Sequence, residues 1–103
     1  MNFQKSKELW QQQVIADPKL TPRAKIILVA ISWHLNRNSR VAWPGFAKLM
    51  RVTGNSRSTV IRAVHAGEKL GHLRVIRRRN SATRNANLYL TASTHVDAVP
   101  KTP

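Results

Sequence analysis

The spacing of apolar residues predicts two helices in the first third of the chain. The segment 6–16 has the pattern of a short helix, with Ser6 as its N-cap and Asp17-Pro18 directly after its end. Thr21-Pro22 is a typical helix start, a capping residue followed by proline at the first helical position. The helix that follows is apolar on one side at Ala24, Ile27, Leu28, Ile31 and Leu35, and on the other at Ile26, Val29 and Trp33. Because it is apolar over most of its circumference, we expect it to be the central helix of the core.

Two further helices are predicted in the middle of the chain, joined by a tight turn. The segment 41–43 has the pattern of a short strand, and it precedes a helix that runs to about Val52. The sequence Thr-Gly-Asn over 53–55 predicts a turn, after which Ser56 caps a helix over 57–70. Two helices joined by about three residues with a central glycine form the helix-turn-helix pattern.

The periodicity changes after the last of these helices. The segment 73–76 is a short β-like run, and 87–91 (Asn-Leu-Tyr-Leu-Thr) alternates polar and apolar residues. We expect the two to pair as a β-hairpin with a basic tip. The fold class is therefore mainly α with a small β-hairpin. We divide the chain into an N-terminal helix over 1–18, a domain over 19–91 and a flexible tail or linker over 92–103.

The helix predicted over 57–70 has one apolar face and one basic face. At about 100° per residue, Ser58, Ile61, Arg62, His65 and Lys69 share one side, opposite Val60, Ala63, Val64, Gly67 and Leu70. Such a helix can insert its polar side into the major groove of duplex DNA, where the first turns read base edges. We therefore expect base contacts from Asn55, Arg57, Ser58, Ile61 and Arg62. Ile61 either touches a thymine methyl group or lies under the hairpin.

Other polar residues are better placed for the DNA backbone. Phosphate contacts fix register and orientation without carrying sequence information, and we expect them from Lys48, Arg51, Ser56, Thr59, His65 and Lys69. The hairpin would add Arg77, Arg78, Arg79, Arg84 and Asn85, on the backbone or in an adjacent minor groove. The alternative for the basic hairpin is a charged edge strand that only discourages aggregation.

The charge balance favours a polyanionic partner. The 103 residues include 18 Lys and Arg but only 4 Asp and Glu, which gives a formal charge of +14 with histidine neutral. All but three of the basic residues lie between Lys19 and Arg84, where Glu68 is the only acid, and we expect Glu68 to pair with a neighbouring cation. Like charges at this density repel one another in a compact fold, and a nucleic acid would compensate them. A merely solvated basic surface is the alternative, although small domains usually carry both signs.

The composition argues against several other classes of protein. There is no cysteine, and the four histidines lack metal-binding spacing, so we expect no metal site. The few acids are dispersed, and we expect no enzyme activity, cofactor or small-molecule ligand. Tyr89 should pack in the hairpin with its hydroxyl at the surface. The longest apolar run, 26–31, is much shorter than the roughly 20 residues of a membrane span, so we expect a cytoplasmic, nucleoid-associated protein without membrane contact.

Four segments carry motifs that occur together in one known family. They are ELWQQQVIADPKLTPRAKIILVAIS, AWPGFAKLM, TGNSRSTVIRA, and GHLRVIRRR followed by NANLYLT. Over residues 7–91 the chain resembles the winged helix-turn-helix domains of phage and plasmid replication proteins and related bacterial regulators. The resemblance implies a compact winged fold, the hairpin as its wing, and double-stranded DNA as the partner.

The chain departs from this family pattern at three positions. Met50 stands where a small alanine is usual, Asn55 where the turn often carries an apolar residue, and Gly67 where the recognition helix commonly presents leucine. A glycine inside a helix costs about 1 kcal/mol relative to alanine unless close packing requires it. Gly67 therefore marks either an unfilled gap or a tight contact.

These patterns predict a sequence-specific duplex DNA-binding protein, either a transcriptional regulator or the origin-binding module of a replication initiator. An RNA-binding or non-specific architectural protein is the alternative, although the exposed arc of the recognition helix lacks the aromatic platforms of single-strand readers. A homodimer through Leu9, Trp10 and Val14 of the N-terminal helix is a further hypothesis. The tryptophans, including Trp33 and Trp43, are expected in the core or a subunit contact, with base stacking as the minor alternative.

Overall fold

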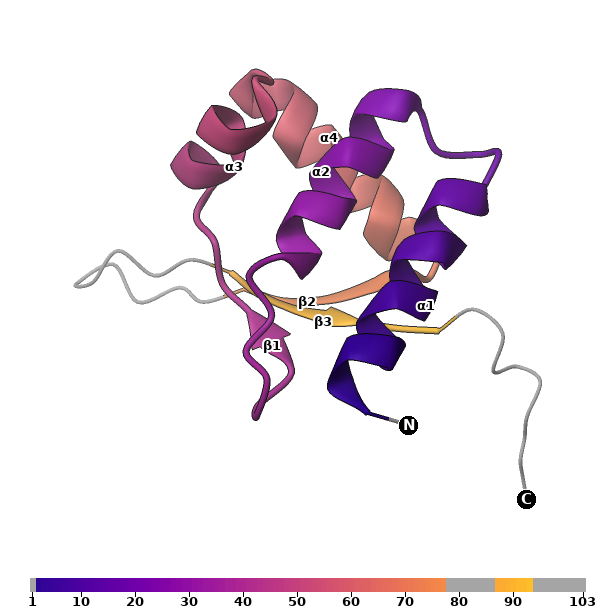
Figure 1. Ribbon diagram of the computed structural model, residues 1–103. Coiled ribbons are helices and arrows are strands. Elements are labelled where there is room, and N and C mark those ends of the chain that lie inside the picture. The colour runs from indigo at the N-terminus through magenta and orange to yellow at the C-terminus, as the bar shows by residue number, and fades with distance from the viewer. Residues whose placement is uncertain (1, 78–86, 94–103) are drawn as a thin grey trace.

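The structure is a computed structural model that describes residues 2–77 and 87–93. This part of the chain forms four helices and a small antiparallel sheet with strand order β1-β3-β2 (Figure 1). The elements are α1 (Phe3–Ala16), α2 (Pro22–Ser32), β1 (Val41–Ala42), α3 (Phe46–Thr53), α4 (Arg57–Lys69), β2 (Leu73–Ile76) and β3 (Leu88–Thr91). The predicted fold class, mainly α with a small β wing, is confirmed.

Local capping signals set most helix boundaries. The hydroxyl of Thr21 accepts the backbone N–H of Ala24, and Pro22 opens α2 as predicted. The prediction that Ser6 caps α1 was wrong. The cap lies four residues earlier, at Asn2, whose carboxamide accepts the N–H of Lys5 at 2.7 Å, and the helix begins at Phe3. The N–H of Ser6 instead bonds to the carbonyl of Asn2, within the helix.

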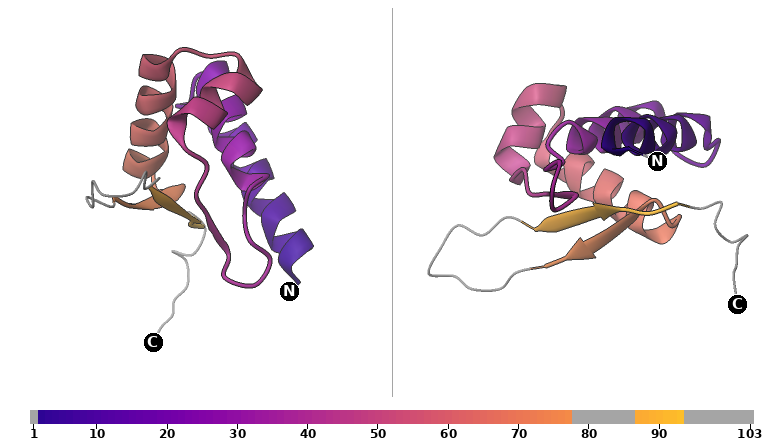
Figure 2. Two further views of the ribbon diagram at one scale, coloured as in Figure 1. Left: turned by 90° about the vertical axis from the view of Figure 1, so that its left-hand side faces the viewer. Right: turned by 60° about the horizontal axis from the view of Figure 1, so that its bottom comes forward.

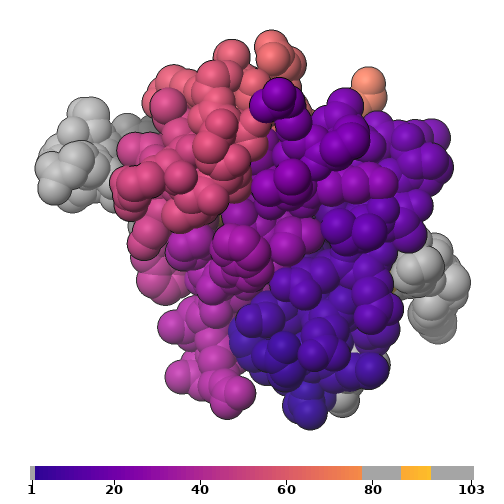
Figure 3. Space-filling model, turned by 45° about the horizontal axis from the view of Figure 1, so that its top comes forward, coloured from indigo at the N-terminus to yellow at the C-terminus, as the bar shows by residue number. Residues whose placement is uncertain are grey.

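The centre of the core is α2, but only part of its circumference is buried. It packs against α4, with α1 and α3 on its flanks, and its Ile27, Leu28 and Ile31 are fully buried. On its other apolar side Ile26 and Trp33 are 54 % and 61 % exposed, so of the positions expected for Trp33 the core is excluded. In Figure 3 the surface of α2 is visible between the surfaces of α1 and α3.

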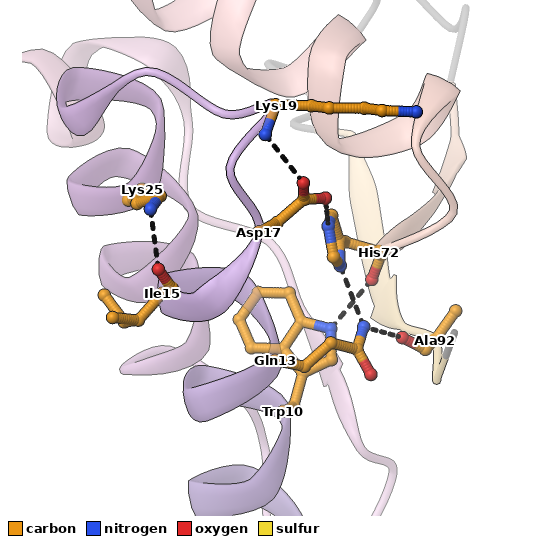
Figure 4. A network of polar contacts seen from close by, with 8 residues as sticks. All are labelled: Trp10, Gln13, Ile15, Asp17, Lys19, Lys25, His72 and Ala92. Carbon is orange, nitrogen blue, oxygen red and sulfur yellow. Dashed lines mark hydrogen bonds and ion pairs between the residues drawn. The ribbon is translucent and has the colours of Figure 1, made fainter. Parts of the chain in front are cut away.

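A polar network attaches α1 to the junction of α4 and β2 (Figure 4). The indole N–H of Trp10 donates to the carbonyl of His72 at 2.8 Å, and His72 Nε2 lies 2.7 Å from the Asp17 carboxylate. The Gln13 carboxamide lies 2.8 Å from His72 Nδ1 and also donates to the carbonyl of Ala92. With its proton on Nε2, the buried His72 therefore satisfies both ring nitrogens. The bond from His72, with a second from the Lys19 N–H, lowers the pKa of Asp17.

This attachment changes the expected role of the N-terminal helix. Trp10 and Val14, two of the three residues suggested for a dimer contact, are buried in the core of their own chain. Leu9 remains exposed. The helix therefore buries Trp10 and Val14 within the domain, where α1 packs on α2, while Ile15 is exposed like Leu9.

The sheet contains one more strand than the predicted hairpin. Strand β3 lies in the middle and pairs with β2 on one side and with β1 on the other, where Ala42 is opposite Tyr89. Figure 2 shows β2 and β3 as a two-stranded arm below the helices. Tyr89 is only 1 % exposed, so the expectation of a surface hydroxyl was wrong, and burial raises the pKa of Tyr89.

Gly67 is a point of close packing between α4 and α2. A β-carbon built at this position would lie 2.9 Å and 3.1 Å from the two terminal carbons of Leu28 and 3.3 Å from a terminal carbon of Leu73. These separations are shorter than the roughly 3.5–4.0 Å preferred by carbon atoms. Of the two explanations offered for Gly67, the geometry supports the tight contact.

Candidate nucleic-acid interface

The turn between α3 and α4 has the geometry that its sequence predicts. Gly54 adopts a left-handed conformation at φ 71°, and its N–H bonds to the carbonyl of Met50 at 2.9 Å, which ends α3. Glycine fits this conformation without steric cost. Ser56 then caps α4 by accepting the N–H of Thr59 at 3.2 Å. The hydroxyl of Ser56, predicted to touch phosphate, is thus already used as the helix cap.

Asn55 is a structural residue of this turn. Its side chain is buried, its Oδ1 accepts from the Arg23 guanidinium at 2.9 Å, and its amide donates to the carbonyl of Thr53 at 3.2 Å. The expectation of a base contact from Asn55 is therefore corrected. The carboxamide turns inward because it can satisfy the turn backbone and a cation of α2 at the same time.

The two faces of α4 lie as the sequence predicts. Val60, Ala63, Val64 and Gly67 are buried, whereas Arg57, Ser58, Arg62, His65 and Lys69 are exposed. Ile61 is half-buried, which agrees with either of its two suggested roles. The Arg57 guanidinium lies 5.0 Å from the centre of the Phe46 ring, so it is held against α3. The base contacts themselves stay predictions.

A groove beside α4 brings together cations that the sequence analysis did not assign to the site. It has a volume of about 610 Å³ and runs between the start of α2 and the outer side of α4. Its polar lining comes from Lys19, Thr21, Arg23, Thr59 and Arg62. Lys19 and Arg23 flank the Thr21 cap of α2, and only the packing of α2 on α4 places them near Arg62.

The other predicted phosphate contacts lie on α3 and along α4. Lys48 and Arg51 are exposed on α3, and Lys48 lines a hollow of about 290 Å³ with His34, Trp43, Pro44 and Gly45. Thr59 is half-buried and accepts a hydrogen bond from the Ser56 hydroxyl at 2.9 Å. Trp43 is 50 % exposed, so of the positions expected for it, the core is excluded, while a subunit contact and base stacking stay predictions.

Part of the wing is visible in the structure. Arg77 forms a two-pronged ion pair with Glu68, with nitrogen–oxygen distances of 3.0 Å and 3.1 Å. The expected pairing of Glu68 is thus confirmed, and the bond lowers the pKa of Glu68 and raises that of Arg77. Arg77 therefore fastens the wing to α4 instead of offering an unpaired charge to DNA. The other proposed wing contacts, Arg78, Arg79, Arg84 and Asn85, lie outside the described residues.

The exposed cations of α3 and α4 have few acids near them. Of the acids in the described segments, Asp17 pairs with His72, Glu68 pairs with Arg77, and Glu8 accepts from Gln4. Within the same segments, no three His, Cys, Asp or Glu side chains gather in a way that could hold a metal ion. None of the helices described combines the length and the apolar character that a membrane span needs.

The turn, the buried side of α4 and its exposed basic side together define a helix-turn-helix fold. The family model of the helix-turn-helix domain matches residues 19–73, and the chain belongs to this family. The match begins just before α2 and ends at the first residue of β2, so it includes the turn and α4. Membership indicates DNA as the partner. A comparison with curated proteins and one with solved structures each gave no match.

Proposed function

We propose that this protein binds double-stranded DNA in a sequence-specific manner, with α4 in the major groove and the β2–β3 hairpin on the backbone or in a minor groove. The observation that carries the proposal is the division of α4. Its apolar side is fixed against α2, while Arg57, Ser58 and Arg62 stand exposed on its first two turns. An α-helix fits the roughly 12 Å width of the major groove, where arginine pairs with guanine.

The groove between α2 and α4 supports this docking. A DNA strand passing along the edge of α4 would meet Lys19 and Arg23 on one side and Arg62 and Thr59 on the other. Lys48 and Arg51 on α3 would contact a neighbouring part of the backbone. In this proposal Arg62 lines the groove between α2 and α4 and also reaches the DNA bases. It is therefore the most informative residue to change.

Selection of bound duplexes from a random DNA pool tests the proposal. We expect a defined sequence to be enriched, and Arg62→Ala to relax the preference by about 1–3 kcal/mol at one position. Arg51→Ala should weaken all duplexes about equally, because phosphates carry no sequence. Lys5→Ala is the matched control, since Lys5 is exposed on α1, outside the groove, α3, α4 and the hairpin, and should change neither property. An unenriched pool, or equal loss of preference in Arg62→Ala and Arg51→Ala, would contradict the assignment of α4 as the reading helix.

The biological role that we propose is regulation of transcription or recognition of a replication origin, in a phage, a plasmid or a bacterial nucleoid. Resemblance to the winged domains of replication proteins and regulators supports both roles equally. Mapping the enriched sequence onto its genome separates them, because a regulator's sites lie at promoters and an initiator's sites cluster at one origin. Competition with duplex RNA of the same sequence tests the RNA-binding alternative, and RNA that competes as well as DNA would favour it.

A further inference from the structure

A second group of cations lies around the ring of Phe3, away from the recognition helix. The Lys7 ammonium is 5.4 Å from the ring centre, and the guanidinium carbons of Arg37 and Arg40 are 5.8 Å and 5.5 Å from it. Lys7 lies on α1, whereas both arginines lie in the connection between α2 and β1. Two segments about thirty residues apart thus bring three positive charges to one place.

Among the ion pairs of the described residues, none joins an acid to Lys7, Arg37 or Arg40. Asp17 pairs with His72 and Glu68 with Arg77, whereas Glu8, next to Lys7 on α1, accepts a hydrogen bond from the neutral Gln4. The face of an aromatic ring attracts each cation, but it carries no net charge and leaves their mutual repulsion in place. Three cations held together with no ion pair to an acid are an arrangement that attracts an anion.

The backbone of the connection between α2 and β1 fixes the position of Arg40. Arg40 has a φ of 61°, the one positive φ at a residue other than glycine in the described segments. A left-handed conformation is unfavourable for arginine and persists where the surroundings impose it, often beside a ligand. Here the side chain of Asn36 accepts the N–H groups of Asn38 and Ser39, and its carbonyl accepts that of Arg40 at 2.8 Å. These bonds hold the bend that brings Arg40 to Phe3.

The position of the cluster separates it from the proposed reading site. In Figure 1 the start of α1 and the connection between α2 and β1 lie at the bottom, and the turn between α3 and α4 lies at the top. The left view of Figure 2 shows the same separation. The cluster is therefore at the opposite end of the molecule from the start of α4.

We propose that Lys7, Arg37 and Arg40 around Phe3 form a second phosphate-binding site, which holds the backbone of a second DNA duplex. One protein molecule would then bridge two duplexes, one on α4 and one on the Phe3 cluster. The inference rests on the proposed function, because it assumes that the first duplex occupies α4. One guanidinium group can donate two parallel hydrogen bonds to the oxygens of a phosphate. Such contacts are independent of base sequence.

The surroundings of the cluster favour DNA over an acidic protein. Protein interfaces are built around buried apolar anchors, whereas residues 36–40 are all polar or charged and all exposed. Phe3 is half-buried and covered by the three cations. A phosphate backbone needs only positive charges and hydrogen-bond donors, and both are present.

A bridging assay tests the inference. A biotinylated duplex that carries the selected sequence is fixed to beads at low density and loaded with protein, and a fluorescent duplex of unrelated sequence is then added. We expect the wild type to retain the fluorescent duplex. The variant that combines Arg37→Gln with Arg40→Gln should retain at least about tenfold less fluorescent duplex, because charge-assisted bonds to phosphate are lost. Lys5→Gln combined with Lys25→Gln removes the same charge at positions outside the cluster, the groove and the hairpin, and this variant should retain the fluorescent duplex like the wild type.

Two measurements separate a ligand site from a structural role. Loading of the first duplex, measured with labelled protein, should be the same for all variants. The thermal midpoint of the double arginine variant should be unchanged or higher, because like charges are removed. Lys7→Gln leaves the connection between α2 and β1 intact and should also lower retention.

Each other result overturns the inference. Loading of the first duplex without retention of the second by the wild type refutes bridging and leaves the proposed function standing. Failure to load the first duplex refutes both. Equal retention by the cluster variant and its control would place the second contact elsewhere, for example in a dimer. Binding of polyglutamate in place of the second duplex would identify an acidic protein as the partner.

Discussion

Substitutions at Gly67 test how closely α4 must approach α2. In Gly67→Leu, the first added carbon alone would lie 2.9 Å and 3.1 Å from the ends of Leu28, and three further carbons have to follow it. Leu28 is fully buried, so its side chain has no solvent to move into. Overpacking of a core costs about 1–3 kcal/mol and occasionally more. Leucine regains somewhat less than about 1 kcal/mol of helix propensity relative to glycine.

For Gly67→Leu we take an overpacking cost at the upper end of this range and subtract the gain in helix propensity. The unfolding free energy should therefore fall by about 2 kcal/mol. For a domain of this size that corresponds to a fall of roughly 8–16 °C in thermal midpoint. Gly67→Ala introduces one carbon, so the gain in propensity and the steric cost nearly cancel, and we expect a change within about 1 kcal/mol of zero. Urea denaturation followed by circular dichroism measures both variants without DNA.

A pair of substitutions at His65 supplies the reference for helix propensity. His65 is exposed on the same helix, so the difference between His65→Ala and His65→Gly reports propensity without packing, about 1 kcal/mol. If Gly67→Ala stabilises the protein by this full difference, and Gly67→Leu stabilises it as well, there is an unfilled gap at Gly67. That result would refute the argument for a tight contact.

Three further predictions follow from other parts of the structure. Asn55→Ala should lower stability by about 1–2 kcal/mol because it removes the bonds to Arg23 and Thr53, while the selected DNA sequence stays the same; a changed sequence would restore Asn55 as a base contact. Because the pKa of Asp17 is lowered in the folded state, its contribution is present above the unfolded pKa of about 3.9 and is lost as the pH falls through the lower folded value. Urea midpoints between pH 2 and 6 should therefore fall less steeply in Asp17→Asn than in the wild type, and equal slopes would contradict this. Finally, log affinity for duplex DNA should fall with log salt at a slope of about −4 to −8, from roughly five to nine phosphate contacts, and a slope near zero in titrations at several salt concentrations would exclude backbone contact as the main source of affinity.

The sequence predicted the features that depend on neighbouring residues. The caps at Thr21 and Ser56, the left-handed Gly54 and the two faces of α4 follow from spacing and residue type within a few positions. Such local signals are read directly from the chain. The start of α1 was missed because Asn2 and Ser6 are both good caps, and the helix extends to the earlier one.

The features that depend on distant residues were not predictable in this way. Asn55 lies where a helical wheel would turn it outward, but its partner Arg23 is 32 residues away. Strand β1 is too short to identify its partner β3 from pattern alone. The exposed sides of Ile26 and Trp33 have the same apolar character as the buried side of α2, and only the placement of α4 decides between them. Lys19 and Arg23 were likewise missed as site residues, because only the packing of α2 on α4 brings them near Arg62.

The network around His72 has a consequence for how large the cooperative unit is. The family match starts at residue 19, after Trp10, Gln13 and Asp17. Yet these three residues cover the imidazole of His72 and form hydrogen bonds with His72. A fragment cut at the family boundary would expose that imidazole and the apolar surface beneath α1 to water. The segment matched by the family model is thus smaller than the segment that folds cooperatively. A truncated protein made to study DNA binding should therefore keep the first eighteen residues.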